Sequence, residues 1–127
     1  MNKLSYKIYH ANLAFSAIPE EQLAEVIDKC YFPLLDFVEK SKTKIGLEIS
    51  GYSLEIIQNI RPAWITKFKE LNNLDLIELI GSGYMQIIAP LVPYKVNLQN
   101  QKIGLETYIN ILGIIPKIVF VNEQTFL

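Results

Sequence analysis

The feature that most constrains the fold of this chain is an alternation of short strand-like runs with longer helix-like segments. Strand-like runs of apolar residues occur at intervals of roughly thirty to forty residues, within residues 4–15, 44–51, 74–80 and 117–124. The segments between them carry apolar residues at helical spacing, as at Leu23, Ile27 and Leu34. Strands that alternate with helices predict a parallel sheet with right-handed crossovers. The expected fold class is α/β, with a parallel βα-repeat sheet in one domain, residues 1–127.

Prolines mark the expected boundaries of the first helices. Pro19 lies in the first turn of a helix, where its missing N–H costs little, and Pro33 is expected to kink or split that helix near Cys30. Cys30, on the apolar face of this helix, is interpreted as an inert small hydrophobe. After the second strand-like run, Ser53 is the expected N-cap of a helix that Arg61-Pro62 breaks.

The second half of the chain predicts two more helices and one long loop. A helix that carries Trp64 in the core is expected to end at Asn72-Asn73. The segment from Tyr84 to Asn100, rich in amides and prolines, is interpreted as the longest irregular stretch. A short helix from Gln101 to Leu112, stopped by Gly113, is expected to follow it.

The last apolar run, Lys117–Val121, ends abruptly in polar residues. A continuous run of this kind is typical of a strand buried on both faces of a parallel sheet. In barrels built from such strands, the chemistry lies at the carboxyl ends of the strands. Glu123, at the tip of this run, is therefore the leading candidate for a catalytic residue. No helix returns to cover the strand before Leu127, so we expect the chain to be the front portion of a larger enzyme.

Composition narrows the choice of function. The formal net charge of −1 gives no electrostatic reason to expect nucleic acid or an anionic membrane surface as a partner. One cysteine and one histidine exclude an internal disulfide and leave too few ligands for the usual zinc site, and nothing implies a cofactor. The N-terminus lacks the pattern of a signal peptide, and no window approaches the roughly 18 apolar residues of a membrane span. A cytoplasmic location is therefore expected.

Polar residues near the ends of the predicted strands are the candidates for a binding site. In a parallel sheet the carboxyl ends of the strands lie on one side, so polar groups remote in sequence converge there. Besides Glu123, the candidates for substrate binding are His10, Asn12, Glu48, Tyr84, Gln86 and Gln124.

Several of these residues also have a structural interpretation. A single histidine near a strand end is more often a hydrogen-bonded structural residue than part of a site. Glu48 and Glu78 interrupt apolar runs; they either line a polar barrel interior or point to solvent at a sheet edge, because an unpaired buried carboxylate is costly. Tyr84, Tyr52 and Phe15 could stack on a ligand, although aromatic side chains usually serve packing.

Taken together, five stretches of the sequence resemble the N-terminal part of glycoside hydrolase family 57 over essentially the whole chain. They are YHANLAFS (9–16), KCYFPLL (29–35), IGLEISGYSLEII (45–57), ELIGSGYMQIIAPLVP (78–93) and LGIIPKIVFVNEQTF (112–126). No single stretch is decisive, and their order and spacing are fairly specific. The family has a (β/α)7 barrel and includes retaining amylases, glucanotransferases and branching enzymes. The resemblance therefore implies the front half of such a barrel and an oligo- or polysaccharide substrate of the α-glucan type.

The resemblance also implies roles for individual residues. The family's early histidine, which lines the sugar subsite next to the scissile bond, matches His10. The nucleophile, a glutamate commonly found in Trp-x-Pro-Glu, matches Glu123, with Asn122 in place of the proline. Gln86 stands where the family has a substrate-binding acid or histidine after a glycine-rich turn. The family's general acid/base is an aspartate from a later strand than any in this chain, so the chain alone is expected to be inactive.

Three other interpretations remain open. A polysaccharide deacetylase shares the broad barrel architecture, but its metal site needs an aspartate and two histidines. A degenerate, non-catalytic barrel that binds a glycan or a protein is favoured by Gln86 and Asn122. A half-barrel that pairs with a second chain is the third, and because the outer strands would be unpaired edges, self-association through these edges is expected.

Overall fold

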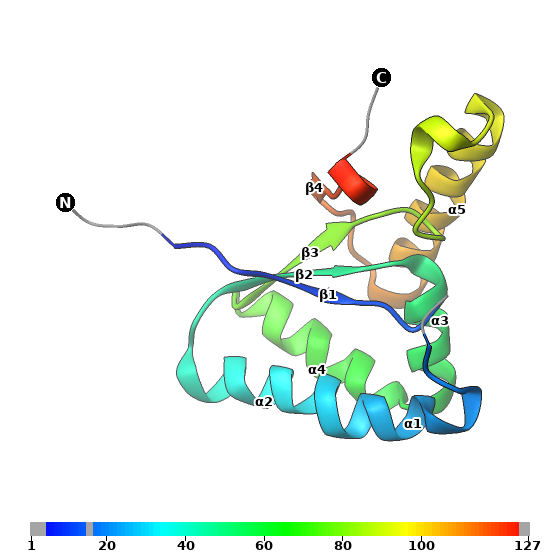
Figure 1. The fold of residues 1–127 in the computed structure, drawn as a ribbon. Coiled ribbons are helices and arrows are strands. Elements are labelled where there is room, and N and C mark those ends of the chain that lie inside the picture. Colours follow the sequence, from blue (N-terminus) through cyan, green and yellow to red (C-terminus); the bar gives the residue numbers. More distant parts are fainter. Residues whose placement is uncertain (1–4, 15–16, 125–127) are drawn as a thin grey trace.

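The computed structural model describes residues 5–14 and 17–124 of the chain. Four strands within this part form one parallel sheet in the order β1-β2-β3-β4. They are β1 (Ile8–Ala11), β2 (Ile45–Ile49), β3 (Ile77–Gly81) and β4 (Ile118–Val119). Helical segments connect consecutive strands (Figure 1), so the predicted α/β fold with a parallel βα-repeat sheet is confirmed.

A helical segment leads from β1 to β2. The short segments η1 (Glu20–Gln22) and α1 (Leu23–Val26) run into a π-helical turn, η2 (Ile27–Tyr31), before α2 (Phe32–Ser41) begins. Pro33 has no N–H to donate to the carbonyl group one turn earlier, and a wider π turn just before it accommodates this loss. The helix that was predicted to kink or split near Cys30 continues through this residue as a π-helical turn. Cys30 itself is exposed, so its expected place on an apolar face is wrong.

Two helices connect β2 to β3, namely α3 (Gly51–Ile60) and α4 (Pro62–Asn73). The N-cap of α3 is Ser50, whose Oγ accepts the N–H of Ser53 at 3.3 Å. The prediction of Ser53 as the cap is therefore wrong, because the helix starts directly at the strand end. Arg61-Pro62 separates the two helices and α4 ends at Asn73, as predicted.

The third connection contains η3 (Ala89–Leu91) and the long helix α5 (Tyr94–Leu112). Pro93 is the residue before the helix, and its fixed backbone angle is compatible with that position. The predicted start at Gln101 is wrong, because the amide-rich segment 94–100 is helical. The helix ends at Gly113, whose φ of 70° is left-handed, as the glycine predicts.

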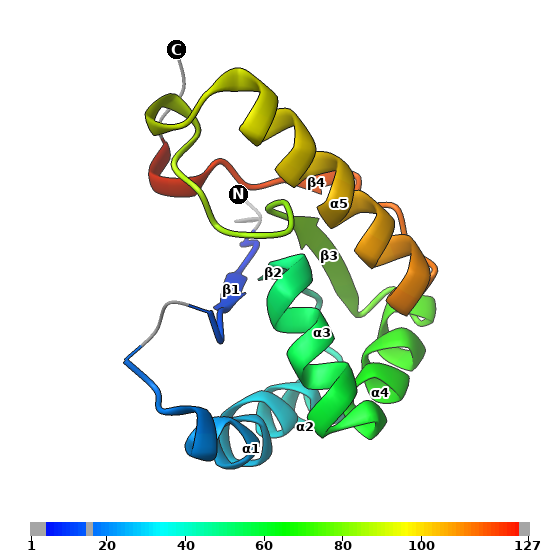
Figure 2. The ribbon, with the colours of Figure 1, turned by 90° about the vertical axis from the view of Figure 1, so that its right-hand side faces the viewer.

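Helices α1, α2, α3 and α4 pack beneath the sheet, while α5 stands at one end beside β3 and β4 (Figures 1 and 2). The core lies between the sheet and this helical layer. It is formed by fully buried apolar side chains of β2, α3 and α4, including Leu47, Ile49, Ile57, Phe68 and Trp64, which confirms the expected place of the tryptophan. No α-helix of the described residues covers the opposite face of β1 and β2 in Figure 1.

The fourth strand is shorter and more exposed than the sequence predicts. Ile118 and Val119 are 41% and 58% exposed, so the expectation of a strand buried on both faces is wrong. The strand lies at the edge of the sheet and pairs with β3 through Ile80 and Gly81. Within the described residues, no element covers its outer edge, which leaves the apolar run open to solvent.

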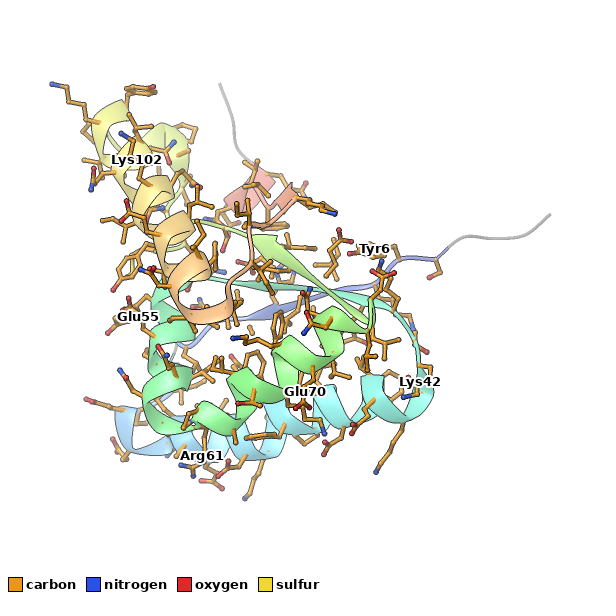
Figure 3. All side chains as sticks on the ribbon, turned by 180° about the vertical axis from the view of Figure 1, so that it is seen from behind. Tyr6, Lys42, Glu55, Arg61, Glu70 and Lys102 are labelled. Carbon is orange, nitrogen blue, oxygen red and sulfur yellow. The ribbon has the colours of Figure 1, made fainter. Side chains whose placement is uncertain are left out.

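Charged side chains lie on the outside of the helical layer, where Arg61 and Glu70 project in Figure 3. The guanidinium group of Arg61 donates two hydrogen bonds to Asp28, at 2.8 and 2.7 Å, and so ties the start of α4 to η2. These hydrogen bonds hold the pKa of Asp28 below its usual range. Among the described residues, no helix is long and apolar enough to cross a membrane.

Candidate active site

Side chains from three separated parts of the chain line one open pocket at the carboxyl ends of the strands. Its volume is about 650 Å³, and its lining comes from the end of β1, the turn after β3 and the segment after β4. The lining residues are His10, Asn12, Gln86, Ile88, Phe120, Asn122, Glu123 and Gln124. The structure therefore brings five of the seven residues predicted for the site into one pocket.

Glu48, also predicted for the site, lies beneath the pocket wall. Its side chain is fully buried, and its Oε2 atom lies 2.9 Å from His10 Nδ1. The Nε2 amide group of Gln86 donates to both carboxylate oxygens, at 3.0 and 3.1 Å. His10 pairs with Glu48 in the register of β1 and β2, so the two side chains point to the same face of the sheet. Glu48 therefore lies in a polar interior and does not point to solvent at a sheet edge.

Glu78 lies on the same face of the sheet, at some distance along it. Its Oε2 atom accepts the hydroxyl of Tyr6 at 2.8 Å. Partial burial of the phenol raises the pKa of Tyr6 to about 12, and the hydrogen bond to Glu78 and the negative charge of Glu78 raise it further in the same direction.

Asn12 shapes the end of β1. Its Oδ1 atom accepts the N–H of Ala14 at 3.0 Å, an arrangement by which asparagine holds a turn two residues ahead. The hydroxyl of Ser53 donates to the same oxygen at 3.4 Å and accepts the N–H of Leu13 at 3.0 Å. The start of α3 thus fixes the direction in which the chain leaves the strand, and with it the pocket wall beside His10.

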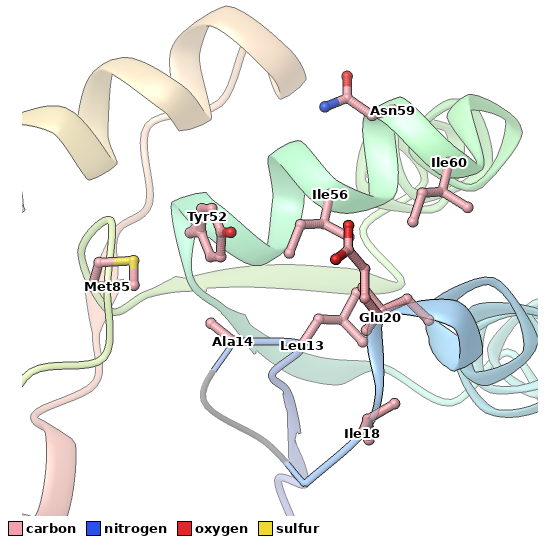
Figure 4. Close-up of a pocket in the computed structure, with 10 residues that line it drawn as sticks. Leu13, Ala14, Ile18, Glu20, Tyr52, Ile56, Asn59, Ile60 and Met85 are labelled. Carbon is pink, nitrogen blue, oxygen red and sulfur yellow. The ribbon is translucent and has the colours of Figure 1, made fainter.

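Tyr84 lies outside the pocket. Its hydroxyl donates to Glu55 Oε2 at 2.9 Å, and its ring meets that of Tyr52 edge-on at 5.9 Å. Burial and the Glu55 carboxylate raise the pKa of Tyr84. Tyr52 lines a separate groove of about 550 Å³ between α3 and the segment after β1, together with Ile56 and Met85 (Figure 4). Phe15, the third predicted stacking residue, lies outside the described residues.

The segment after β4 places Glu123 at the mouth of the pocket. The side chain is exposed, and the backbone of Glu123 (φ 55°, ψ 16°) and of Gln124 (φ 52°) is left-handed. The segment is tied to its surroundings by the amide of Asn122, which donates to the carbonyl of Ile87 at 3.0 Å. The ring of Phe120 meets that of His10 edge-on at 4.8 Å. These contacts join the end of β4 to the turn after β3 and to β1.

Asn100 holds the turn that carries Gln86, a role that the sequence does not predict. From α5 its side chain accepts the N–H of Met85 at 2.7 Å and donates to the carbonyl of Met85 at 2.9 Å. The amide group of Asn100 thus makes the hydrogen bonds to Met85 that a neighbouring strand would make in a sheet. The sequence gives no signal for this role of Asn100, because the segment around it resembles a loop and not the helix α5.

Gly104 and Tyr108 of α5 hold the same turn. A Cβ atom at Gly104 would lie 2.4 Å from the carbonyl carbon of Gly83 and 2.5 Å from the nitrogen of Tyr84. The hydroxyl of Tyr108 accepts the N–H of Ser82 at 3.1 Å and donates to the carbonyl of Ile49 at 2.6 Å. The signal for this close packing was the glycine itself, since glycine within a helix costs stability unless another backbone approaches it.

The pocket offers a carboxylate, an imidazole and several amides, which suit hydrogen bonding to hydroxyl groups and nucleophilic or acid/base chemistry at Glu123. No group of three histidine, cysteine, aspartate or glutamate side chains in the described part of the chain could hold a metal ion.

Comparison with known proteins agrees with this architecture. The α-amylase of Pyrococcus furiosus is 21% identical over 103 residues, which are 80% of this chain and 16% of that protein. The solved 4-α-glucanotransferase of Thermococcus litoralis superposes with a TM-score of 0.80 at 20% identity, over 96% of this chain and 19% of that one. A family 57 branching enzyme of Thermococcus kodakaraensis superposes with a TM-score of 0.69 at 17% identity, over 93% of this chain and 32% of that one. The chain thus spans less than a third of each of these relatives.

The model of glycosyl hydrolase family 57 matches residues 7–126, which include every element of the sheet and every lining residue of the pocket. This match favours a glycosidase-type relative over a polysaccharide deacetylase. The chain belongs to glycosyl hydrolase family 57.

Proposed function

We propose that this chain is the front half of the catalytic barrel of a family 57 retaining enzyme, a glycosidase or a glucanotransferase, that acts on α-glucan-type carbohydrate. The observation that carries the proposal is the position of Glu123, an exposed carboxylate in an open polar pocket at the carboxyl rim of a parallel sheet. The family membership of the chain and the activities of the similar enzymes supply the reaction class.

Glu123 is the proposed nucleophile. Its left-handed backbone is uncommon for a residue with a side chain and costs on the order of 1 kcal/mol, and such strain is concentrated at functional sites. In the proposed reaction, a carboxylate oxygen attacks the anomeric carbon and forms a glycosyl ester while the bond to the leaving oxygen breaks. Water or an acceptor sugar then releases the glycosyl group, with net retention of configuration.

We propose that the general acid/base is not one of the residues that line this pocket. A retaining glycosidase needs a second carboxyl group about 5–5.5 Å from the nucleophile to protonate the leaving oxygen. Glu48, the other carboxylate near the pocket, is buried and bonded to His10 and Gln86, so it is not placed to exchange protons with a substrate. We assign this role to an aspartate of a later strand that completes the barrel.

His10, Asn12, Gln86 and Gln124 are the proposed substrate-binding residues, because they line the pocket around Glu123. Glu48 acts behind His10 and Gln86 rather than on the substrate itself. Tyr84 and Tyr52 belong to an outer part of the rim, where a longer oligosaccharide could extend.

The test uses α-maltotriosyl fluoride and intact-protein mass spectrometry. Fluoride leaves without protonation, so the nucleophile alone forms the glycosyl ester, and without an acid/base the ester hydrolyses slowly and accumulates. We expect the chain to gain the mass of one maltotriosyl group, and the Glu123→Gln variant to gain none. Glu106→Gln, an exposed carboxylate on α5, is the matched control and is expected to label normally. Labelling of Glu123→Gln would assign the nucleophile to another residue.

A non-catalytic carbohydrate-binding barrel is the second candidate, and Gln86 and Asn122 favour it because neither supplies a charge at the pocket. It is supported if maltotriose binds and the fluoride labels no protein. Hydrolysis of maltooligosaccharides by the chain alone, abolished by Glu123→Gln, would instead contradict the proposal that the acid/base lies elsewhere.

A further inference from the structure

The buried carboxylate of Glu48 faces two side chains of the pocket at once. Nothing of Glu48 is exposed to solvent, whereas the side chain of His10 is half exposed. Within hydrogen-bond distance of its oxygens lie His10 Nδ1, at 2.9 Å, and Gln86 Nε2, at 3.0 and 3.1 Å. A buried carboxylate is retained only where such partners satisfy it.

The three contacts of Glu48 suit a carboxylate that only accepts hydrogen bonds. Its Oε2 atom lies within reach of both nitrogens, and its Oε1 atom is within reach of Gln86. An ionised carboxylate only accepts hydrogen bonds and can satisfy donors at both oxygens, whereas a protonated one carries a hydrogen on one of them. The amide NH₂ group of Gln86 is a donor, so it suits two accepting oxygens.

An accepting carboxylate determines where the hydrogens of its partners lie. His10 must then carry its hydrogen on Nδ1, which leaves Nε2 on the far side of the ring. Gln86 must turn its NH₂ group toward Glu48, which leaves Oε1 as the free end of its amide. His10 and Gln86 both line the pocket.

We propose that Glu48 is a positioning residue, whose ionised carboxylate fixes His10 as the Nδ1–H tautomer and Gln86 with its NH₂ group turned inward. His10 Nε2 and Gln86 Oε1 then face the pocket as hydrogen-bond acceptors and select ligand groups that donate, such as hydroxyls. The assignment of those hydroxyls to a sugar rests on the proposed function; the orientation of the two side chains does not.

The test is a long-range ¹H–¹⁵N correlation spectrum of the imidazole ring. The chain has one histidine, so the spectrum needs no assignment among several rings. At about pH 8.5, where an ordinary imidazole is neutral, we expect His10 to show the pattern of a protonated Nδ1 and a bare Nε2. A predominant Nε2–H tautomer in the unsubstituted chain overturns the proposal without any variant being needed.

The matched variants are Glu48→Gln and Glu78→Gln. Glutamine at position 48 keeps the shape of the side chain but brings an NH₂ group toward His10, so the ring is expected to switch to the Nε2–H tautomer. Glu78 lies on the same face of the sheet and bonds to Tyr6 instead, so Glu78→Gln is expected to leave the tautomer unchanged. An unchanged His10 pattern in folded Glu48→Gln would refute the positioning role.

Titration with maltotriose separates this inference from the proposed function. We expect maltotriose to shift the Nε2 resonance of His10 and to bind about tenfold more weakly to Glu48→Gln, because two acceptors of the pocket are turned or lost. The expected tautomer without any response to millimolar maltotriose would overturn the sugar assignment while supporting the positioning role of Glu48.

Discussion

At the scale of single residues, the side chain of Asn100 holds the turn that presents Gln86. It makes both hydrogen bonds of Met85 that a neighbouring strand would otherwise make. Asn100→Ala leaves the part-buried N–H of Met85 without its partner, whereas the carbonyl of Met85 still accepts the N–H of Ile87, so we expect a loss of about 1–2 kcal/mol in the free energy of unfolding. Urea denaturation measures it, with Asn110→Ala, an exposed position on the same helix, expected to change stability by less than about 0.5 kcal/mol. Equal changes in both variants would mean that the hydrogen bonds to Met85 contribute nothing to stability.

Tyr6 gives a prediction for alkaline pH. Its pKa is raised from 10.0 to about 12, first by partial burial and then by Glu78, so the neutral phenol is favoured in the folded state. Its contribution to stability is therefore fully present below pH 10 and lost as the pH rises through about 12. The difference in absorbance at the phenolate band between the chain and Tyr6→Phe is expected to titrate near pH 12. A difference that titrates near pH 10 would show that the Tyr6–Glu78 contact does not form in solution.

The candidate site shows which residues a sequence can reveal. His10, Asn12, Gln86 and Gln124 line one pocket with Glu123, and this convergence is predictable because the strand ends of a parallel sheet meet on one side. How deeply a side chain is buried at that rim depends on packing between strands, so the sequence alone does not decide whether Glu48 is buried. Tyr84 was placed at the right turn, but its direction depends on Glu55, a helix residue without any pattern of its own.

At the scale of elements, the contact of α5 with the turn after β3 depends on Gly104. Alanine there gains up to about 1 kcal/mol in helix propensity, but its Cβ would collide with the backbone of Gly83 and Tyr84. We expect Gly104→Ala to lower the free energy of unfolding by about 1–3 kcal/mol, because the helix must move away. Chemical denaturation would measure this loss, and weaker binding of maltotriose is expected with it.

Gly113→Ala is the contrasting variant for that experiment. A Cβ at Gly113 meets no atom within 4 Å, so only its left-handed φ of 70° opposes the substitution. The expected loss is about 1 kcal/mol, without any effect on the pocket. A loss at Gly104 no larger than at Gly113 would contradict the close backbone packing of α5.

The elements that the sequence predicted well are those with local signals. Pro33, Arg61-Pro62 and Gly113 act on their own backbone and marked true boundaries. The start of α5 at Tyr94 is not predicted because Asn97 and Asn100 resemble loop residues, while the place of Asn100 is decided by its hydrogen bonds to Met85, in a turn distant in sequence. The exposure of β4 was missed for a related reason, since an apolar run indicates a strand but not what covers it.

At the scale of the whole molecule, the sheet has two open edges, β1 and β4. Ile8 on β1 is 42% exposed and Val119 on β4 is 58% exposed, and exposed apolar strand edges tend to pair with other chains. We therefore expect the chain expressed by itself to self-associate, which size-exclusion chromatography with light scattering measures as a mass above 14.6 kDa.

Charged substitutions on these edge strands distinguish strand pairing from non-specific hydrophobic association. The double variant Ile8→Lys with Val119→Lys is expected to shift the chain toward monomer, because a lysine on an edge strand opposes pairing with a second strand. Leu74→Lys, at a 64% exposed apolar position in the turn after α4, is the control and is expected to leave the association unchanged. A sharp monomer peak with cooperative melting for the unsubstituted chain would show that the four-stranded sheet is stable with both edges open. Dissociation by Leu74→Lys alone would place the contact on the helical side, away from the strands that a complete barrel would join.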